Sequence, residues 1–232
     1  MNVHIAGTGK LATELLQQLS PTAVFTVSPW SGEVASGAAS QAGGGGRAIV
    51  VHAGSGRELG GIVDFCQRTG AVLVELATGS ALEGVQTGFP VVLCPNTNLL
   101  MLKFMCMLER SGALFQGSRI RVTESHQASK ASVPGTAVAM AQSLGVAAAE
   151  IRSVRDPAQQ VSGLGIPPGQ LARHAFHRIE VDDGLCSITM ETRVLGEAPY
   201  AQGVQRIIEA ICQRELPKRV HTVTEFIENG WV

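Results

Sequence analysis

The chain has 232 residues, of which 45% are hydrophobic, and a formal net charge of −1 at pH 7. This length suffices for one large domain or for two small ones with hydrophobic cores. A charge so close to zero gives no electrostatic basis for binding nucleic acid or an anionic membrane surface. No apolar run reaches the roughly eighteen residues of a membrane-spanning helix.

The five cysteines predict a reducing compartment. Their number is odd, they show no Cys-x-x-Cys spacing, and most of them lie in apolar runs. Such cysteines are typical of buried free thiols. The first residues enter a strand directly, without the basic start and apolar core of a secretory signal. We therefore expect a cytoplasmic protein.

The N-terminal segment carries a dinucleotide-binding pattern. Residues 3–6 predict an apolar strand, a Gly-x-Gly-x-x-Ala turn follows, and a helix runs to about residue 19. In this fingerprint the first glycine permits the tight turn, the second lets the backbone approach the pyrophosphate, and the alanine keeps the helix close to the sheet. An ordinary glycine-rich turn is the alternative. The expected cofactor contacts are Gly7, Thr8, Gly9, Lys10 and Leu11.

The next segment bears on the choice of cofactor. Residues 23–27 predict the second strand, whose end in NAD-preferring folds often carries an acid that binds the ribose 2′-hydroxyl. Residues 28–31 contain no acid, and none follows before Glu33, but no arginine for a 2′-phosphate stands there either. We expect NADPH to be preferred modestly, with NADH possible. Residues 32–46 are rich in Gly, Ala and Ser and predict a mobile loop.

Further strands are predicted at residues 48–51, 71–76 and 91–94, with a helix at residues 59–69. Ligands of doubly wound sheets bind at the carboxyl ends of the strands, so Ala53 and Gly54 should face the cofactor. For His52, a structural role at the strand end is the favoured interpretation. Residues 99–114 are strongly apolar and indicate a buried helix that links two domains, in preference to a Met-rich binding surface.

Residues 124–137 concentrate the chemistry of the chain. They follow a strand predicted at residues 120–123 and precede a helix predicted at residues 137–149. The first N–H groups of a helix are unpaired and its dipole favours an anion there. Lys130 adds a positive charge, and His126 can give a proton near neutral pH. The pattern predicts a carboxylate-binding site beside a proton donor; a solvated loop with an incidental histidine is the alternative.

The C-terminal third predicts a hairpin and a helix. Residues 161–170 are Gly/Pro-rich and loop-like, and residues 171–181 and 185–194 alternate like two antiparallel strands joined at 182–184. His174 and His177 have a spacing that could bind zinc on a helix, but on a strand they point to opposite faces, so no metal site is expected. A helix is predicted at residues 204–214.

The central segment resembles the signature of dihydrodipicolinate reductases, which runs Glu-x-His-His-x-x-Lys-x-Asp-x-Pro-Ser-Gly-Thr-Ala. Gln127 replaces the second histidine, Ser132 replaces the acid, and the turn is one residue shorter and lacks its serine. The residues that match are Glu124, His126, Lys130, Pro134, Gly135, Thr136 and Ala137.

The resemblance extends over nearly the whole chain, thinly between residues 20 and 50. Residues 77–79 resemble the Gly-Thr-Thr-Gly turn against the nicotinamide, and residues 95–98 resemble an Ala-Asn-Phe-Ser turn at the domain boundary. These turns imply that Thr78, Gly79 and Asn96 contact the cofactor.

A third matching segment lies where the family's chain returns to its nucleotide domain, and residues 220–227 resemble the family's short C-terminal segment. The family pattern at the return is Ser-Arg-x-x-Phe-Ala-x-Gly; Tyr200, Ala201 and Gly203 match it, while Glu197 stands at the arginine. His177 falls near a histidine that the family keeps in its sheet.

The resemblance implies an α/β fold with a Rossmann-type doubly wound parallel sheet and a second α+β domain with a mixed or antiparallel sheet. Residues 1–97 and 199–232 would form the dinucleotide-binding domain, and residues 98–198 the substrate-binding and oligomerisation domain. We expect a homo-oligomer, most simply a tetramer as in the family, because a chain this short can hardly cover the apolar face of the second sheet alone.

The implied activity is hydride transfer from NAD(P)H to an unsaturated cyclic imine carboxylate of the lysine and diaminopimelate pathway. His126 would be the general acid, and Lys130 would bind the substrate carboxylate and assist protonation. Gln127, Gly135 and Thr136 would complete the substrate site. A paralogous imine or carbonyl reductase with a less charged substrate is one alternative, because the departures weaken the dicarboxylate clamp. A nucleotide-binding sensor is the other, and the retained His126 and Lys130 argue against it.

Overall fold

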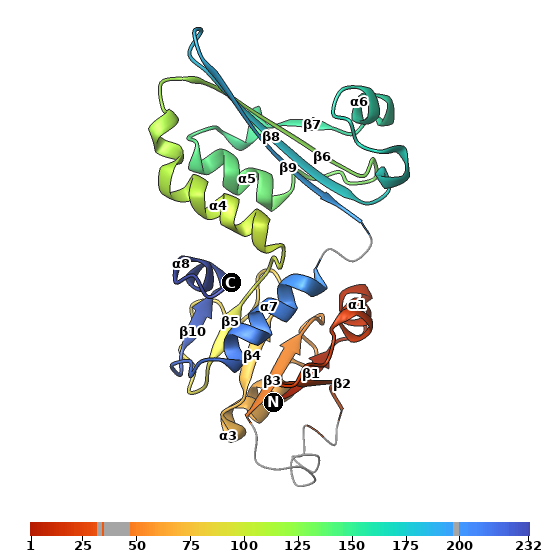
Figure 1. Cartoon of the computed structure of the whole chain (residues 1–232), viewed down its shortest axis with the longest axis vertical. Coiled ribbons are helices and arrows are strands. Elements are labelled where there is room, and N and C mark those ends of the chain that lie inside the picture. Colours follow the sequence, from red (N-terminus) through yellow and green to blue (C-terminus); the bar gives the residue numbers. More distant parts are fainter. Residues whose placement is uncertain (32–33, 35–46, 197–199) are drawn as a thin grey trace. The chain divides into compact units, whose positions relative to one another are not determined.

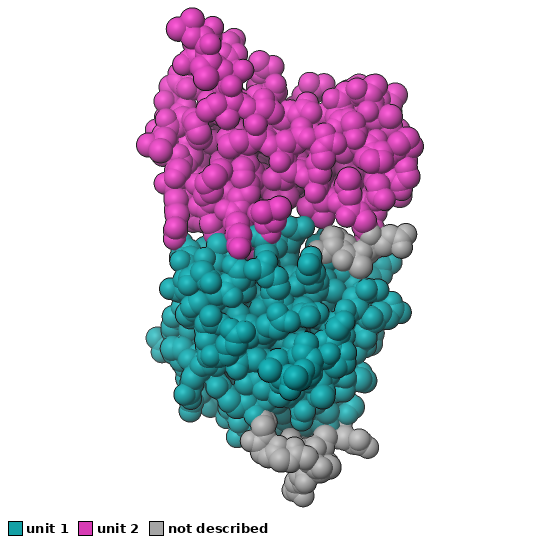
Figure 2. All heavy atoms as spheres, in the orientation of Figure 1, with its two compact units in different colours: residues 1–99, 200–232 teal, residues 100–199 magenta. Residues whose placement is uncertain are grey.

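The computed structural model describes residues 1–31, 34, 47–196 and 200–232 (Figure 1). Apart from residue 34, the loop expected at residues 32–46 lies outside the described residues, and so does Glu197. The chain divides into two compact units, which Figure 2 colours separately. Unit 1 comprises Met1–Leu99 and Tyr200–Val232, and unit 2 comprises Leu100–Pro199.

Unit 1 is built on a six-stranded parallel sheet in the order β10-β5-β4-β3-β1-β2. Its strands are β1 (Asn2–Ala6), β2 (Thr26–Pro29), β3 (Ala48–His52), β4 (Val72–Glu75), β5 (Val91–Leu93) and β10 (Val220–Thr222). Its helices are α1 (Lys10–Gln18), α3 (Leu59–Thr69), α7 (Ala201–Cys212) and α8 (Val223–Glu228). From β1 the chain moves outward to β2, and from β3 it moves the opposite way to β4. Since such crossovers are right-handed, α1 and α3 cover opposite faces, and the expected doubly wound fold is confirmed.

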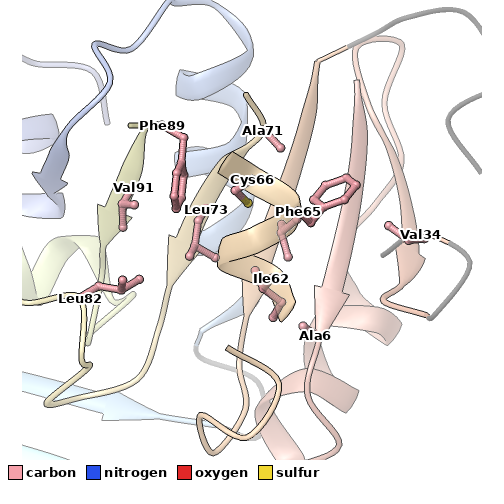
Figure 3. Packing of buried hydrophobic residues seen from close by; sticks show 11 residues of the cluster. Ala6, Val34, Ile62, Phe65, Cys66, Ala71, Leu73, Leu82, Phe89 and Val91 are labelled. Atoms are coloured by element: carbon pink, nitrogen blue, oxygen red, sulfur yellow. The ribbon is translucent and has the colours of Figure 1, made fainter. Parts of the chain in front are cut away.

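One face of this sheet is packed by α3. Ile62, Phe65 and Cys66 of α3 lie against Ala6 and Leu73 of the sheet, all nearly or fully buried (Figure 3). The contacts repeat at helical spacing along α3, which explains why an apolar stretch bounded by glycines forms a helix there. This core fixes the turns that follow β1, β3 and β4.

The second strand differs from its prediction. It spans Thr26–Pro29 and not residues 23–27, because β1 pairs with it from Asn2↔Thr26 to Ile5↔Pro29. A proline is tolerated here because β2 is an edge strand and one side of it needs no ladder donor. A hydrogen bond between His4 Nδ1 and Ser28 Oγ, 2.9 Å long, supports the observed register.

The segment that returns to unit 1 is fixed by two contacts. Glu14 of α1 is buried, and its Oε1 accepts hydrogen bonds from the N–H groups of Tyr200 (3.0 Å) and Ala201 (3.1 Å), which caps α7. Gly203 packs against the backbone of Thr97: a Cβ at this position would lie 1.7 Å from the Thr97 carbonyl oxygen. The glycine is therefore required by close approach of two backbone segments.

We predict that Gly203→Ala destabilises unit 1 by about 2 kcal/mol or more, because a backbone carbonyl cannot move aside as a flexible side chain can. Urea unfolding followed by circular dichroism measures the change. Gly60→Ala is the matched control: Gly60 is also helical, no described atom lies within 4 Å of its added Cβ, and we expect no loss of stability there. Equal stability of wild type and Gly203→Ala would contradict the packing described.

Unit 2 holds a four-stranded mixed sheet in the order β7-β6-β8-β9. Its strands are β6 (Arg119–His126), β7 (Arg152–Val154), β8 (His174–Asp182) and β9 (Ser187–Leu195). Strands β6 and β7 are parallel and the other pairs are antiparallel, so the expected second α+β fold is confirmed. The helices are α4 (Leu99–Ser111), α5 (Gly135–Ser143) and α6 (Pro157–Ser162), with short 3-10 turns η2 (Gly112–Phe115), η3 (Ala148–Glu150) and η4 (Pro168–Gln170).

Three details of unit 2 differ from the sequence-based expectations. Strand β7 and helix α6 were not predicted, and α6 takes up the start of the expected loop. Helix α5 begins at Gly135 and ends at Ser143, whereas residues 137–149 were expected. The Gly-Thr pair therefore forms the first turn of the helix itself.

The apolar face of the second sheet is covered within the chain. Val122, Ile179 and Val181 pack with Met140 of α5 and Leu108 of α4 in one buried core. The expectation that this face stays uncovered in one copy is therefore wrong. The opposite face carries ion pairs, in which Arg178 and Arg193 both contact Glu191 (2.8 and 2.6 Å). Across the described part of the chain, each helix is too short or too polar to cross a membrane.

Candidate active site

The turns with the predicted cofactor residues meet at one edge of unit 1. They follow β1, β3, β4 and β5, which are neighbouring parallel strands. Parallel strands bring their carboxyl ends to the same edge, where doubly wound sheets bind ligands. The residues placed there are Gly7, Thr8, Gly9, Lys10 and Leu11 after β1, Ala53 and Gly54 after β3, Thr78 and Gly79 after β4, and Asn96 after β5.

The turn after β1 is crowded at one glycine and open at the other. Gly7 has φ 131°, and a Cβ on it would lie 2.6 Å from the carbonyl oxygen of Ala53. Gly9 is exposed and forms the N-cap of α1, and no described atom lies within 4 Å of its added Cβ. An open backbone at a helix N-terminus can accept a phosphate. This geometry fits a dinucleotide pyrophosphate.

Asn96, in the turn after β5, makes hydrogen bonds within that turn. Asn96 Oδ1 accepts a hydrogen bond from the N–H of Asn98 (2.9 Å), and its carbonyl accepts one from the Cys94 thiol (3.1 Å). The acceptor oxygen of Asn96 therefore shapes the turn, and its amide group is the part that can meet a ligand. Thr78 and Gly79 are exposed.

A buried hydrogen-bonded pair lies beneath these turns. His52 and Glu75 are fully buried, and His52 Nδ1 lies 2.9 and 2.8 Å from the two carboxylate oxygens. Glu75 Oε1 also accepts a hydrogen bond from the N–H of Ala77 (2.9 Å). The pair joins the ends of β3 and β4, which agrees with the structural interpretation of His52.

The central segment of unit 2 is organised by a buried carboxylate. Glu124 is fully buried at the end of β6, and its Oε2 accepts a hydrogen bond from His126 Nδ1 (2.9 Å). Arg155 donates from Nη2 to Oε1 (2.6 Å) and from Nη1 to Oε2 (3.2 Å). The Ser153 hydroxyl also donates to Oε1. Alternation along β6 puts Glu124 and His126 on one face, and β7 delivers Ser153 and Arg155 beside them.

These contacts fix the charge of Glu124 and the tautomer of His126. Burial raises the pKa of Glu124, but the hydrogen bonds from His126, Arg155 and Ser153 outweigh burial and bring the pKa down to about 2. An ionised carboxylate only accepts hydrogen bonds, so Nδ1 of His126 carries a proton. The ring is held at Nδ1, and Nε2 remains for a ligand. The His126 side chain is 14% exposed, whereas that of Glu124 is inaccessible.

His177 lies against His126 and is neutral near pH 7. The rings are 5.7 Å apart in a T-shaped arrangement, and His177 Nδ1 lies 3.1 Å from the Thr192 hydroxyl. Burial and then the neighbouring charge of His126 lower the pKa of His177 to about 4, with Glu124 acting weakly the other way. His177 therefore packs against the His126 ring without adding a charge.

A second polar cluster lies on the other face of β6. Gln160 of α6 donates from Nε2 to the carbonyl of His126 (2.8 Å) and to the Ser125 hydroxyl (3.0 Å). That hydroxyl also bonds His174 Nε2 (2.9 Å). His174 and His177 thus bond different partners on opposite faces. This cluster fixes the backbone of β6 at His126.

The loop after β6 is hydrogen-bonded to Arg155, which also binds Glu124. The carbonyl of Lys130 accepts a hydrogen bond from Arg155 Nε (2.9 Å), and its N–H donates to the carbonyl of Gln127 (3.0 Å). Among the described residues, the Lys130 ammonium makes no ion pair. Helix α5 begins at Gly135 with Pro134 as its N-cap and no described side-chain cap, so the first N–H groups, including that of Thr136, have no helical partner.

Sequence reasoning found His126 and Lys130 but assigned no role to Glu124, Ser153, Arg155 or Gln160. The spacing of Glu124 and His126 was a usable signal, because residues two apart on a strand share a face. The partners from β7 and α6 had no signal, since neither element was predicted.

We predict that His177 makes folding stability depend on pH. Its pKa is lower in the folded chain (about 4) than the ordinary 6.5, so unfolding takes up a proton in that window. Its contribution is complete above pH 6.5 and is lost as the pH falls toward 4, by up to roughly 3 kcal/mol. Urea unfolding at a series of pH values measures the slope. His177→Gln should flatten it, and an unchanged slope in that variant would contradict the assignment.

Comparisons with curated proteins find similarity to reductases over part of the chain. No family model matches the chain. The probable 4-hydroxy-tetrahydrodipicolinate reductase 1, chloroplastic, of Oryza sativa subsp. japonica is 38% identical over 104 residues, which is 42% of this chain and 30% of that protein. The 4-hydroxy-tetrahydrodipicolinate reductase 2, chloroplastic, of Arabidopsis thaliana is 31% identical over 134 residues, 53% of this chain and 38% of that protein. The chain thus matches less than two fifths of the length of these curated relatives.

Solved structures agree on the fold. A dipicolinate-bound dihydrodipicolinate reductase from Paenisporosarcina sp. TG-14 has a TM-score of 0.64 at 14% identity, over 95% of this chain and 97% of that one. A C. glutamicum DAP dehydrogenase in complex with DAP has a TM-score of 0.55 at 10% identity, over 97% and 93%. At these identities the likeness establishes the shared two-unit architecture and no more.

Proposed function

We propose that the chain, which is similar to curated 4-hydroxy-tetrahydrodipicolinate reductases over part of its length, is an NAD(P)H-dependent reductase acting on an unsaturated cyclic imine carboxylate. The observation that carries the proposal is the His126 ring, held through Nδ1 by the ionised, buried Glu124. It stands just before a loop with Lys130 and the open N-terminus of α5. Proton donor and anion site lie within fourteen consecutive residues, 124–137.

His126 would act as the general acid. When a hydride adds to an unsaturated carbon, the neighbouring atom gains negative charge, and a proton from His126 Nε2 neutralises it. The ring keeps its Nδ1 proton throughout and donates it in a hydrogen bond to Glu124. It therefore stays in one orientation while Nε2 loses and regains a proton. Partial exposure of the ring gives the substrate access.

Lys130 and the start of α5 would bind the substrate carboxylate. The N–H groups of Gly135 and Thr136 stand at the positive end of the helix dipole, and the Thr136 hydroxyl adds a donor. Lys130 contributes a full charge that no described acid neutralises. Gln127 stands where the family pattern has a histidine and would add an uncharged donor to the site.

Unit 1 would hold the nicotinamide dinucleotide, which supplies the hydride when bound. The fit rests on the turn after β1, where Gly7 allows Ala53 to approach and Gly9 leaves the backbone open. We propose a modest preference for NADPH over NADH. The support is that Trp30 and Ser31, which follow β2, include no acid to repel a 2′-phosphate.

We predict that Gly9→Ala weakens dinucleotide binding at least tenfold without lowering stability. The added methyl group meets no described atom of the protein, but it would stand where the pyrophosphate must approach the backbone. Calorimetric titration with NADPH and with NADH measures the affinities. The matched control is Gly61→Ala on α3, whose added Cβ is equally free of described neighbours. Unchanged affinity in Gly9→Ala would place the dinucleotide elsewhere.

We predict that His126→Gln lowers kcat by about a hundredfold while NADPH binding is kept, since it removes the proton donor alone. Lys130→Ala should raise KM as well, because it removes the charge that holds the carboxylate. The assay follows NADPH oxidation against a panel of cyclic imines and 2-oxo acids that includes the lysine-pathway intermediate. Full activity of His126→Gln on the substrate found would overturn the acid assignment.

A second candidate is a paralogous imine or carbonyl reductase with a less charged substrate. Gln127 and the shortened Pro-Gly-Thr turn favour it, because Gln127 puts an uncharged donor where the family pattern has a histidine, and the turn lacks the family's serine donor. Gln127→His discriminates the two: activity on the lysine-pathway intermediate should rise if this site is the obstacle. A nucleotide-binding sensor without catalysis is the third candidate, and it gains if no substrate is found and Gln127→His changes nothing.

We also propose that the protein is a cytoplasmic homo-oligomer, a tetramer in the simplest case. The support for assembly is that β9 is an edge strand with exposed apolar residues Leu185, Ile188 and Leu195 in or beside it. The support for a reducing compartment is that none of the five cysteines, all of which the structure describes, forms a disulfide. Light scattering tests the assembly, and the mass of a single chain at micromolar concentration would contradict it.

A further inference from the structure

The guanidinium of Arg155 contacts two parts of the candidate site at once. It binds both oxygens of the Glu124 carboxylate, and its Nε donates to the carbonyl of Lys130. Its side chain is 21% exposed, so most of it is withdrawn from water. One arginine therefore connects the partner of His126 with the loop that presents Lys130.

Several titratable and charged groups of unit 2 lie on the elements around His126. Glu124 lies on its own strand, Arg155 follows β7, His174 and His177 lie on β8, and Lys130 lies in the next loop. Burial lowers the pKa of both His174 and His177, so neither is charged near neutral pH. The charge in contact with His126 is then the negative charge of Glu124, and the positive charge of Arg155, which binds the same carboxylate, offsets it.

This cancellation matters for proton transfer. A buried carboxylate without a countercharge attracts a proton on its neighbour strongly, because the local dielectric is low. A histidine beside such a carboxylate would hold its proton to high pH and would be a poor donor. Bidentate contact with Arg155 removes most of this attraction while leaving the hydrogen bond that orients the ring.

We propose that Arg155 is a positioning residue that sets the pH at which His126 releases its proton and, through the Lys130 carbonyl, holds the carboxylate-binding loop. This rests on the proposed function only for its catalytic consequence. The charge relation between Arg155, Glu124 and His126 is a property of the free protein.

The test compares Arg155→Met and Arg155→Lys with wild type. Histidine-labelled protein is titrated by NMR, with the His126 signal assigned from its loss in His126→Gln. The midpoint of the His126 titration should move to higher pH by about one unit or more in Arg155→Met, and by less in Arg155→Lys, which keeps the charge but loses the fork. Glu124→Gln, which removes the negative charge, should move it to lower pH.

The matched control is Arg178→Met. Arg178 is also a part-buried arginine of the second sheet paired with a glutamate, Glu191 (2.8 Å), but it lies on the opposite face of β8 from His177. It should leave the His126 midpoint unchanged. Circular dichroism confirms that each variant is folded, and Arg155→Lys retains a readable signal if Arg155→Met does not fold.

The pH–rate profile of NADPH oxidation supplies the second readout. The limb on which the rate falls with rising pH should move to higher pH in Arg155→Met, together with the NMR midpoint. An unmoved midpoint in a folded Arg155→Met or Arg155→Lys protein overturns the proposal and leaves the proposed function untouched. A moved midpoint with an unmoved limb overturns both the catalytic role of Arg155 and His126 as the acid. A moved midpoint with no substrate found supports the charge relation and counts against the proposed function.

Discussion

The hydrogen-bonded charge pair of Glu124 and Arg155 is the constraint on which the candidate site depends. A fully buried carboxylate is costly unless it is paired and its remaining oxygen lone pairs are satisfied. Arg155, Ser153 and His126 together meet this requirement. Because the carboxylate cannot be left unpaired, β6, β7 and the His126 ring are held in one arrangement.

Unit 1 shows the same principle in a different form. His52 and Glu75 hold the ends of β3 and β4 together by a buried hydrogen bond, and Glu14 caps α7 from α1. Backbone approach is used where side chains would not fit, at Gly7 against Ala53 and at Gly203 against Thr97. Polar contacts and glycines thus determine the conformation of the turns, while the apolar core stabilises the sheet.

The sequence predicts the elements whose signals are local. The predicted bounds of helix α3 and strand β3 agree with the structure to within one residue, because an apolar run bounded by glycines is visible in the chain itself. Strand β2 was misplaced because Pro29 reads as a strand end, although an edge strand tolerates it. The network of Glu124 could not be predicted, because its partners arrive through the pairing Glu124↔Ser153 of β6 with β7, which depends on tertiary contacts. The covered apolar face of the second sheet was missed for the same reason.

We propose that residues 124–137 bind a carboxylate next to a proton donor, His126, whose ring is hydrogen-bonded to Glu124. The most direct measurement is a crystal structure of the chain with NADPH and pyridine-2,6-dicarboxylate, a flat analogue of an unsaturated cyclic imine dicarboxylate. We expect one carboxylate on the N–H groups of Gly135 and Thr136, with His126 Nε2 within hydrogen-bonding distance of the ligand and its Nδ1 still on Glu124. A ligand bound away from α5, or a His126 ring turned off Glu124, would contradict the account.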